Sequence, residues 1–284
     1  MTGGENVLSF VGCTMHLEIS EPCRLVLQVA VATGPAAGEV IERMAVSNNG
    51  EPATAAEVGG SRGARQHMVL AKPGLVTVDY QASVAEATAN TYEHAIATDG
   101  DRIIAMRPSR YCPSDRLDGF ALSHFGRESN FGRTHSPAAQ ARAICDYVFE
   151  RIAYVSGSSE SHTDAIDTLL SGRGVCRDFA HLTAALCRSV DIPARIVAVY
   201  APGLSPMDLH VVVETEIDGR WCIWDSTRLA PRQTLVRIAT GRDAADLAFA
   251  TLIPGTGQLT FLETRAVAAT DLPYDGHSAI VYLA

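Results

Sequence analysis

One cysteine, Cys176, stands at a position that favours nucleophilic chemistry. It follows two glycines, Gly172 and Gly174, and opens a segment of helical periodicity. Free backbone N–H groups and the helix dipole at such a start favour a thiolate over a thiol, and they can stabilise an oxyanion formed by attack on a carbonyl. A lone cysteine is more often a small buried apolar residue, so residues further along the chain decide between these interpretations.

The nearest polar residues in the sequence are unsuitable as a base for Cys176. Along a helix, His181 lies about 140° around the axis from Cys176 and Asp178 about 200°, so both point away from it. We expect Asp178 to complement the amino terminus of the helix and His181 to pack or hydrogen-bond inside the protein. The base must come from another part of the chain.

A predicted β-hairpin supplies a histidine and an aspartate on one face. The strand-like runs 209–217 and 220–224 flank Asp-Gly at 218–219, a strong signal for a two-residue hairpin turn. In that register, Asp225 is the diagonal neighbour of His210, and the period of two directs both side chains to the same face. The opposite face is then expected to form an apolar layer of Val211, Val213, Cys222 and Trp224.

Cys176, His210 and Asp225 are the kinds of residue that a thiol enzyme requires. His210 is expected to take the proton of Cys176 and return it to a leaving amine. Asp225 is expected to hold the imidazole in the correct tautomer and to stabilise its charged form. A single histidine on a strand is usually structural, and Asp225 alone would be typical of a turn. Because both are expected on the same face of one hairpin, we predict a Cys176–His210–Asp225 triad.

The rest of the sequence indicates two domains of different character. Residues 1–105 contain strand-like runs divided by Gly, Pro and Asn clusters, which predicts a sandwich of about seven short strands. Helical patterns follow at 136–152, 163–172 and 176–190, and then strands at 195–200 and in the hairpin, with a last strand at 279–283. We therefore expect an α+β chain with a β-sandwich domain at 1–110 and a catalytic domain at 111–284. Residues of the β-domain and the runs 154–163 and 201–209 are expected to line the site because they lie near it.

Composition and charge exclude several classes of protein. Hydrophobic residues make up 47% of the 284 residues and the formal net charge is −9, so the chain can bury a core and lacks the basic stripe of a nucleic-acid binder. We expect no membrane span and no export signal. The seven cysteines are scattered and odd in number, which favours reduced thiols in a cytoplasmic protein, although a Cys13–Cys23 disulfide stays open.

No motif in the sequence predicts a metal or cofactor site. His-Glu-x-x-His, zinc-site spacings, a calcium loop, a P-loop and a dinucleotide fingerprint before a helix are all missing from the sequence. We therefore expect no metal and no cofactor.

The motifs around the three residues resemble those of the bacterial transglutaminase-like superfamily, whose members are described as candidate cysteine proteases. The likeness rests on Gly-Val-Cys-Arg-Asp-Phe-Ala-His at 174–181, Leu-His-Val-Val-Val-Glu at 209–214 and Trp-Asp-Ser-Thr at 224–227, in that order. The segment 108–115 resembles the one that joins the family's amino-terminal β-domain to its core. The resemblance implies a papain-like core, with the nucleophile helix packed on an antiparallel sheet, and acyl transfer through a thioester.

The expected function is hydrolysis of a peptide, isopeptide or other amide bond. One alternative is transfer of the same acyl group to an amine, and another is a non-catalytic binding protein that has kept the fold. The chain is much shorter than the large animal transglutaminases, so we do not extend calcium activation or protein cross-linking to it. Substrate identity and oligomeric state cannot be read from the sequence.

Overall fold

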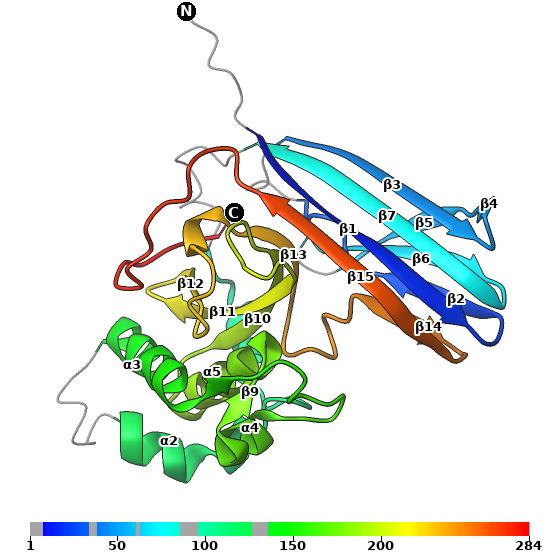
Figure 1. Cartoon of the computed structure of the whole chain (residues 1–284). Helices are drawn as coiled ribbons and strands as arrows, with labels where there is room; N and C mark the ends of the chain where they lie inside the picture. Colours follow the sequence, from blue (N-terminus) through cyan, green and yellow to red (C-terminus); the bar gives the residue numbers. More distant parts are fainter. Residues whose placement is uncertain (1–7, 34–38, 61–62, 86–95, 127–135, 284) are drawn as a thin grey trace, which may run out of the picture.

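A β-sandwich occupies one end of the molecule (Figure 1). The computed structural model describes residues 8–33, 39–60, 63–85, 96–126 and 136–283. One sheet has the strand order β15-β1-β7-β3-β4 and the other β14-β2-β6-β5. Their bounds are β1 Leu8–Ile19, β2 Cys23–Leu27, β3 Val40–Asn48, β4 Glu51–Pro52, β5 Ala55–Gly59, β6 Arg65–Ala71, β7 Gly74–Ala85, β14 Ala250–Ile253 and β15 Gly257–Val267.

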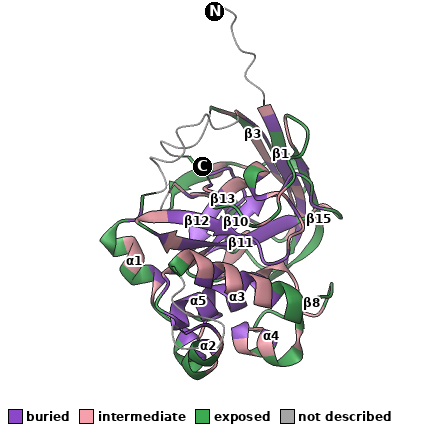
Figure 2. Ribbon diagram, turned by 90° about the vertical axis from the view of Figure 1, so that its left-hand side faces the viewer, coloured by how far each residue is buried: buried purple, intermediate pink, exposed green. Residues whose placement is uncertain are grey.

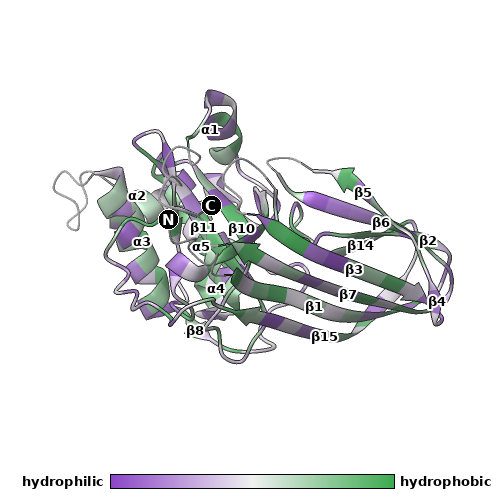
Figure 3. Cartoon of the chain, turned by 90° about the horizontal axis from the view of Figure 1, so that it is seen from above, coloured by the Kyte–Doolittle hydropathy of each residue, from purple (hydrophilic) through white to green (hydrophobic). Residues whose placement is uncertain are grey.

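Strand periodicity builds the sandwich core. Alternate residues of β7 are buried, among them Val76, Val78 and Tyr80, and they join apolar side chains of the second sheet, such as Leu25 and Val69, in one cluster. The long strands β15, β1, β7 and β3 run side by side in Figure 3. The sandwich is therefore held by the inward-facing residues of both sheets.

The division expected at residue 110 differs from the observed topology. Two late strands return to the sandwich, because β15 pairs with β1 and β14 pairs with β2. Residues 250–267 thus belong to the sandwich rather than to the expected domain at 111–284. Periodicity marks a segment as a strand, but it does not specify which distant strand will be its partner.

The second part of the molecule is an antiparallel sheet with helices on one side (Figure 2). The sheet has the order β12-β11-β10-β13, and α5 packs against it within a shared apolar cluster. The expected α+β class, with a helix beginning at Cys176 on an antiparallel sheet, is confirmed. The bounds are α1 Asp99–Ala105, η2 Ser114–Arg116, α2 Asp118–Phe125, α3 Pro137–Arg151, β8 Ala153–Tyr154, α4 Ala165–Ser171, β9 Arg173–Gly174, α5 Cys176–Ser189, β10 Ala194–Tyr200, β11 Leu209–Ile217, β12 Arg220–Trp224, η3 Arg232–Thr234 and β13 Val236–Gly241.

Local capping explains where the helices begin and end. The Ser136 side chain accepts from the Ala139 N–H at the start of α3, and Asp164 caps α4. The helix α4 ends at Gly172, which adopts the left-handed conformation with φ 64°. These boundaries confirm the three helices predicted around the site.

The last predicted strand, at 279–283, is wrong. That segment has no strand geometry, although the Ile223 N–H of β12 donates to the Val281 carbonyl at 2.8 Å. Val281 and Leu283 are buried against the outer face of the sheet. An apolar alternating run can therefore satisfy its side chains by packing without forming a full ladder of backbone hydrogen bonds.

The two parts of the molecule share one apolar core. Tyr200, at the end of β10, is fully buried, and its hydroxyl donates to the Val29 carbonyl of the sandwich at 2.7 Å.

Among the described residues, no helix has the length and apolar composition needed to cross a lipid bilayer.

Candidate active site

The start of α5 holds Cys176 in a constrained turn. A Cβ atom on Gly174 would lie 2.7 Å from the Cβ of Asp178, so only glycine fits at this approach. The buried Asp178 carboxylate accepts from the Val175 N–H at 2.9 Å. This contact confirms that Asp178 complements the helix amino terminus, and it leaves Cys176 as the first residue of the helix.

Cys176 differs from the other cysteines in its exposure. All seven are free thiols in the structure, so Cys13 and Cys23 form no disulfide, and Cys176 is half-buried whereas the other six are buried. Burial raises the pKa of each buried thiol, to about 11 for Cys13, to about 12 for Cys112, Cys145 and Cys222, and upward also for Cys23 and Cys187.

The predicted hairpin has the predicted register. Asp218 and Gly219 form the turn with φ values of 49° and 84°, and the pairs run from Ile217 with Arg220 to Val213 with Trp224. The predicted apolar layer is confirmed, because these four side chains join the core cluster that contains α5: Val211, Val213, Cys222 and Trp224.

The structure brings His210 and Asp225 into direct contact. The imidazole Nε2 and the carboxylate Oδ2 lie 2.9 Å apart, and the two residues are 0% and 2% exposed. The other carboxylate oxygen, Oδ1, accepts from the Thr227 N–H at 2.8 Å and from its hydroxyl at 2.7 Å. The Asp225 side chain is therefore held from both sides, and it holds the imidazole in turn.

The charges of this pair stabilise each other. Burial by itself lowers the pKa of His210, but the charge of Asp225 and its hydrogen bond outweigh burial and raise that pKa above its usual range. Burial raises the pKa of Asp225, and the His210 charge together with the Thr227 hydrogen bonds reverses this and lowers it. The pair therefore favours an imidazolium beside a carboxylate.

The Cys176 thiol lies next to the same imidazole. Its proximity also contributes to the raised pKa of His210. Nε2 is bonded to Asp225, and in the described part of the chain no group makes a full hydrogen bond with the buried Nδ1. Nδ1 is thus the nitrogen left for the thiol, in a contact that falls short of full hydrogen-bond geometry.

Tyr154 belongs to the site, although sequence reasoning did not assign it a role. It lies in β8, which pairs with β9 so that Tyr154 is opposite Gly174, and its ring is 5.8 Å from that of Phe179. Its hydroxyl accepts a hydrogen bond from the backbone N–H of Cys176, which lowers the pKa of Tyr154. Burial and the neighbouring thiol outweigh this effect and raise the pKa to about 12, so the hydroxyl stays protonated. A parallel pairing of two residues has no recognisable sequence pattern. The sequence indicated this segment only because 154–163 lies near the predicted site.

His181 has a structural role, as expected. It is fully buried, its Nε2 accepts from the Ala244 N–H at 3.1 Å, and its ring stacks on Tyr111 at 5.1 Å. Burial lowers its pKa well below the usual range, so it is a neutral imidazole. His181 is therefore separate from the pair formed by His210 and Asp225.

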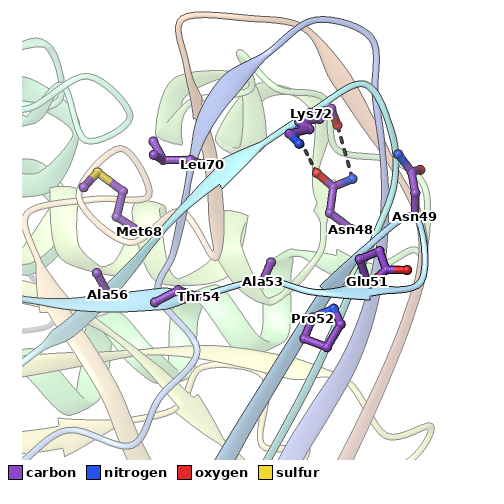
Figure 4. A pocket seen from close by; sticks show the side chains of 10 residues that line it. All are labelled: Asn48, Asn49, Glu51, Pro52, Ala53, Thr54, Ala56, Met68, Leu70 and Lys72. Atoms are coloured by element: carbon purple, nitrogen blue, oxygen red, sulfur yellow. Dashed lines mark hydrogen bonds between the residues drawn. The ribbon is translucent and has the colours of Figure 1, made fainter.

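The structure also bears on metal sites and on pockets away from the thiol. Across the described ranges, no group of three or more His, Cys, Asp or Glu side chains is arranged to hold a metal ion. A pocket of about 530 Å³ lies at the end of the sandwich, where the chain crosses from β4 to β5 (Figure 4). No cysteine or histidine is among the residues that line it, which are Asn48, Asn49, Glu51, Pro52, Ala53, Thr54, Ala56, Met68, Leu70 and Lys72.

Comparison with known proteins gives the class of this chain. The sequence model of the transglutaminase-like superfamily matches residues 128–226, which include Cys176, His210 and Asp225. A solved structure of a candidate cysteine protease from Cytophaga hutchinsonii is 32% identical, covers 95% of this chain and 95% of that one, and has a TM-score of 0.81. This chain belongs to the transglutaminase-like superfamily.

Two further relatives are more distant or shorter in overlap. An uncharacterized protein of Mycobacterium leprae (strain TN) is 31% identical over 155 residues, and the match spans 50% of this chain and 52% of that curated relative, about half its length. The periplasmic domain of TgpA from Pseudomonas aeruginosa is 19% identical over 79% of this chain and 89% of that one. Its TM-score of 0.41 is too low to bear on function.

Proposed function

We propose that the protein is a thiol enzyme that hydrolyses an amide bond, in a peptide or isopeptide, through a Cys176–His210–Asp225 triad. One observation carries the proposal: the buried His210–Asp225 pair leaves Nδ1 free beside the half-exposed thiol of Cys176. Membership of the transglutaminase-like superfamily and the likeness to a candidate cysteine protease support the same class of reaction.

The reaction proceeds in two steps of acyl transfer. The Cys176 thiolate attacks the carbonyl carbon, and the imidazolium of His210 gives its proton to the nitrogen as the C–N bond breaks, which releases an amine and leaves a thioester. Water then attacks the thioester while His210 takes its proton. The C–S bond breaks, the acid is released, and Cys176 returns to its first state.

The same thioester also permits the alternative reaction. An amine in place of water would give transfer rather than hydrolysis, with the same proton movements at His210. A binding protein without activity would have no need to hold an imidazole and a carboxylate 2.9 Å apart inside the core, next to a thiol.

The test is the alkylation of Cys176 by iodoacetamide between about pH 5 and 9. At about pH 6.5 we expect Cys176 to react at least about tenfold faster than any other cysteine, because the others are buried with raised pKa values. His210→Ala is expected to abolish the fast reaction below about pH 8, because the imidazolium no longer stabilises the thiolate. Peptide mapping by mass spectrometry locates the label.

A denatured sample serves as the control for this labelling. All seven cysteines should then react at similar rates, which shows that the folded structure, and not the local sequence, selects Cys176. Uniform slow labelling of the folded wild type, unchanged by His210→Ala, would refute the proposed triad.

We further propose that Tyr154 helps to bind the oxyanion. The Cys176 N–H donates to the Tyr154 hydroxyl, which remains protonated and can itself donate to an oxygen at the reacting carbonyl. Tyr154→Phe is therefore expected to lower the acylation rate roughly 10²-fold, the usual effect of losing one oxyanion donor.

Two measurements distinguish this role from a structural one. Tyr154→Phe should leave the pH profile of Cys176 alkylation unchanged, since the His210–Asp225 pair is intact. Tyr274→Phe removes a hydroxyl from a tyrosine that is 92% exposed and should keep the full rate. An unchanged acylation rate in Tyr154→Phe would exclude the hydroxyl from the oxyanion site.

A further inference from the structure

The two halves of the proposed triad lie on different elements. Cys176 opens α5, whereas His210 belongs to β11 and Asp225 directly follows β12. The distance between the thiol and the imidazole therefore depends on how α5 is held against this end of the hairpin. Most of that interface is an apolar cluster, and apolar contact is non-directional, so it does not fix this distance by itself.

A buried hydrogen bond joins α5 to the end of the hairpin. The hydroxyl oxygens of Thr183 and Ser226 lie 2.5 Å apart, and both residues are buried. Ser226 directly follows Asp225 in the sequence. Thr183 comes seven residues after Cys176, so it lies about 20° from Cys176 around the helix axis and about 10 Å further along it. The hydroxyl pair thus holds the same face of α5 that carries the thiol.

Other buried polar side chains of α5 bond to other segments. His181 accepts from the Ala244 N–H, and Arg188 donates to the Ala194 carbonyl at the beginning of β10. Thr183 instead bonds to the segment that orients the imidazole. Its hydrogen bond therefore connects the nucleophile helix directly to the carboxylate end of the triad.

The three residues that follow β12 each make a different contact. Asp225 bonds to Nε2 of His210 at 2.9 Å. Ser226 bonds to Thr183, and Thr227 donates to the Asp225 carboxylate through its N–H and its hydroxyl. A shift of Ser226 relative to α5 would therefore carry the carboxylate, and with it the imidazole, away from the thiol.

We propose that the Thr183–Ser226 hydrogen bond is a positioning contact of the triad, which sets the distance between the Cys176 thiol and the His210 imidazole. This inference rests on the proposed function. Thr183 lies two helical turns from the thiol, so the pair acts through the placement of the reacting groups. A misplacement of about 1 Å between such groups can lower a rate about 100-fold.

The experiment measures acylation and thiolate formation in the whole chain. With p-nitrophenyl acetate, the thiolate attacks the acetyl carbon and the ester C–O bond breaks, so the rate of the nitrophenol burst reports formation of the thioester. Alkylation by iodoacetamide across pH reports how far the imidazolium stabilises the thiolate. The variants are Thr183→Val, which replaces the hydroxyl with a methyl group, and Ser226→Ala, which removes its partner.

Each single variant is expected to lower the acylation rate about tenfold, because the thiol and the imidazole are no longer held at the right distance. Fast alkylation of Cys176 should also require a higher pH, since a more distant imidazolium stabilises the thiolate less. Thr183→Ser keeps the hydroxyl and should keep most of the wild-type rate.

The double variant, Thr183→Val with Ser226→Ala, separates positioning from stability. Each single variant leaves one buried hydroxyl without its partner and should lower the Tm, whereas the double variant removes both hydroxyls and should recover part of that loss. Its acylation rate should nevertheless stay about tenfold below that of the wild type, because two independent effects would multiply to about a hundredfold and one shared contact does not.

Thr168→Val is the matched control for the loss of a buried threonine hydroxyl. Thr168 is fully buried, and its hydroxyl donates to the Asp164 carbonyl at the start of its own helix, α4, at 2.9 Å. The same chemical change here should lower the Tm but leave the acylation rate and the alkylation profile unchanged.

Three outcomes would overturn the inference, and they differ from a failure of the proposed function. They are a wild-type acylation rate in both single variants, a rate in the double variant that recovers together with its Tm, and an equal loss of rate in Thr168→Val. A nitrophenol burst that is missing in the wild type, or that persists in Cys176→Ala, would instead refute the thiol mechanism itself.

Discussion

Replacement of Cys176 with alanine is expected to lower amide hydrolysis by at least about 10⁵-fold, because removal of a triad nucleophile removes the covalent route entirely. The expected result follows from the place of the thiol. It is at the first residue of α5, beside the free Nδ1 of His210, and the six other cysteines are buried. The measurement is the rate of amine release from an amide substrate, or the burst of nitrophenol that is released when p-nitrophenyl acetate acylates the thiol.

Cys187→Ala is a matched control within the same helix. Cys187 is fully buried in α5 and lies in the core cluster, so its removal should reduce stability but keep the activity. Thermal unfolding of both variants shows whether each retains the fold. Activity that survives Cys176→Ala, in a folded protein, would exclude Cys176 as the nucleophile.

The part of the site that could be predicted from sequence depends on local geometry. Asp218-Gly219 specifies a two-residue turn, and that turn fixes the strand pairing as far as Val213 with Trp224. Just beyond the paired residues, the side chains of His210 and Asp225 meet. The helix start at Cys176 likewise follows from the nearby glycines and from Asp178, which accepts from the Val175 N–H. Short-range rules of this kind need only a few consecutive residues.

The features that could not be predicted depend on contacts between distant segments. The strand β15 pairs with β1 across more than two hundred residues of chain, and its own sequence does not identify that partner. Tyr154 reaches Cys176 because β8 pairs with β9. That pairing is only two residues long, so it leaves no pattern in the sequence. The run 279–283 alternates like a strand, yet it packs on the sheet with a single backbone contact to Ile223.

The burial of His210 and Asp225 is better explained by function than by stability. A buried ion pair must compensate for the loss of hydration of both groups, and apolar residues of similar size often give equal or greater stability. Here the pair is almost fully buried, and the Thr227 N–H and hydroxyl offset part of that cost. An arrangement that does little for folding but prepares an imidazole beside a thiol is typical of an active site.

Asp225→Asn is expected to lower activity by about 10³- to 10⁴-fold, the size of effect seen when a triad loses the carboxylate that orients its histidine. The amide oxygen can still accept from the Thr227 N–H, as Oδ1 of Asp225 does now. The amide NH₂ would then face Nε2 of His210 and donate to it, so the imidazole proton would move to Nδ1. In that tautomer Nδ1 can no longer take the proton of Cys176.

The effect of Asp225→Asn on the free energy of unfolding is expected to depend on pH. Asp225 raises the pKa of His210 in the folded protein, so the pair stabilises the fold fully below the unfolded histidine pKa of about 6.5, and this contribution is lost as pH rises through the raised value. The lowered pKa of Asp225 contributes stability above about pH 4, and this is lost in acid. The difference in free energy of unfolding between wild type and Asp225→Asn should therefore be largest between about pH 4 and 6.5.

Glu216→Gln provides the matched control, because it makes the same chemical change in the same hairpin. Glu216 accepts from Arg102 and the Gly219 N–H, away from the thiol, so its replacement should leave both the activity and the pH profile of Cys176 alkylation unchanged. In Asp225→Asn, by contrast, the alkylation profile should move to higher pH, because burial now lowers the pKa of His210 without an opposing charge. An Asp225→Asn variant with normal activity and an unmoved profile would show that the carboxylate does not orient His210.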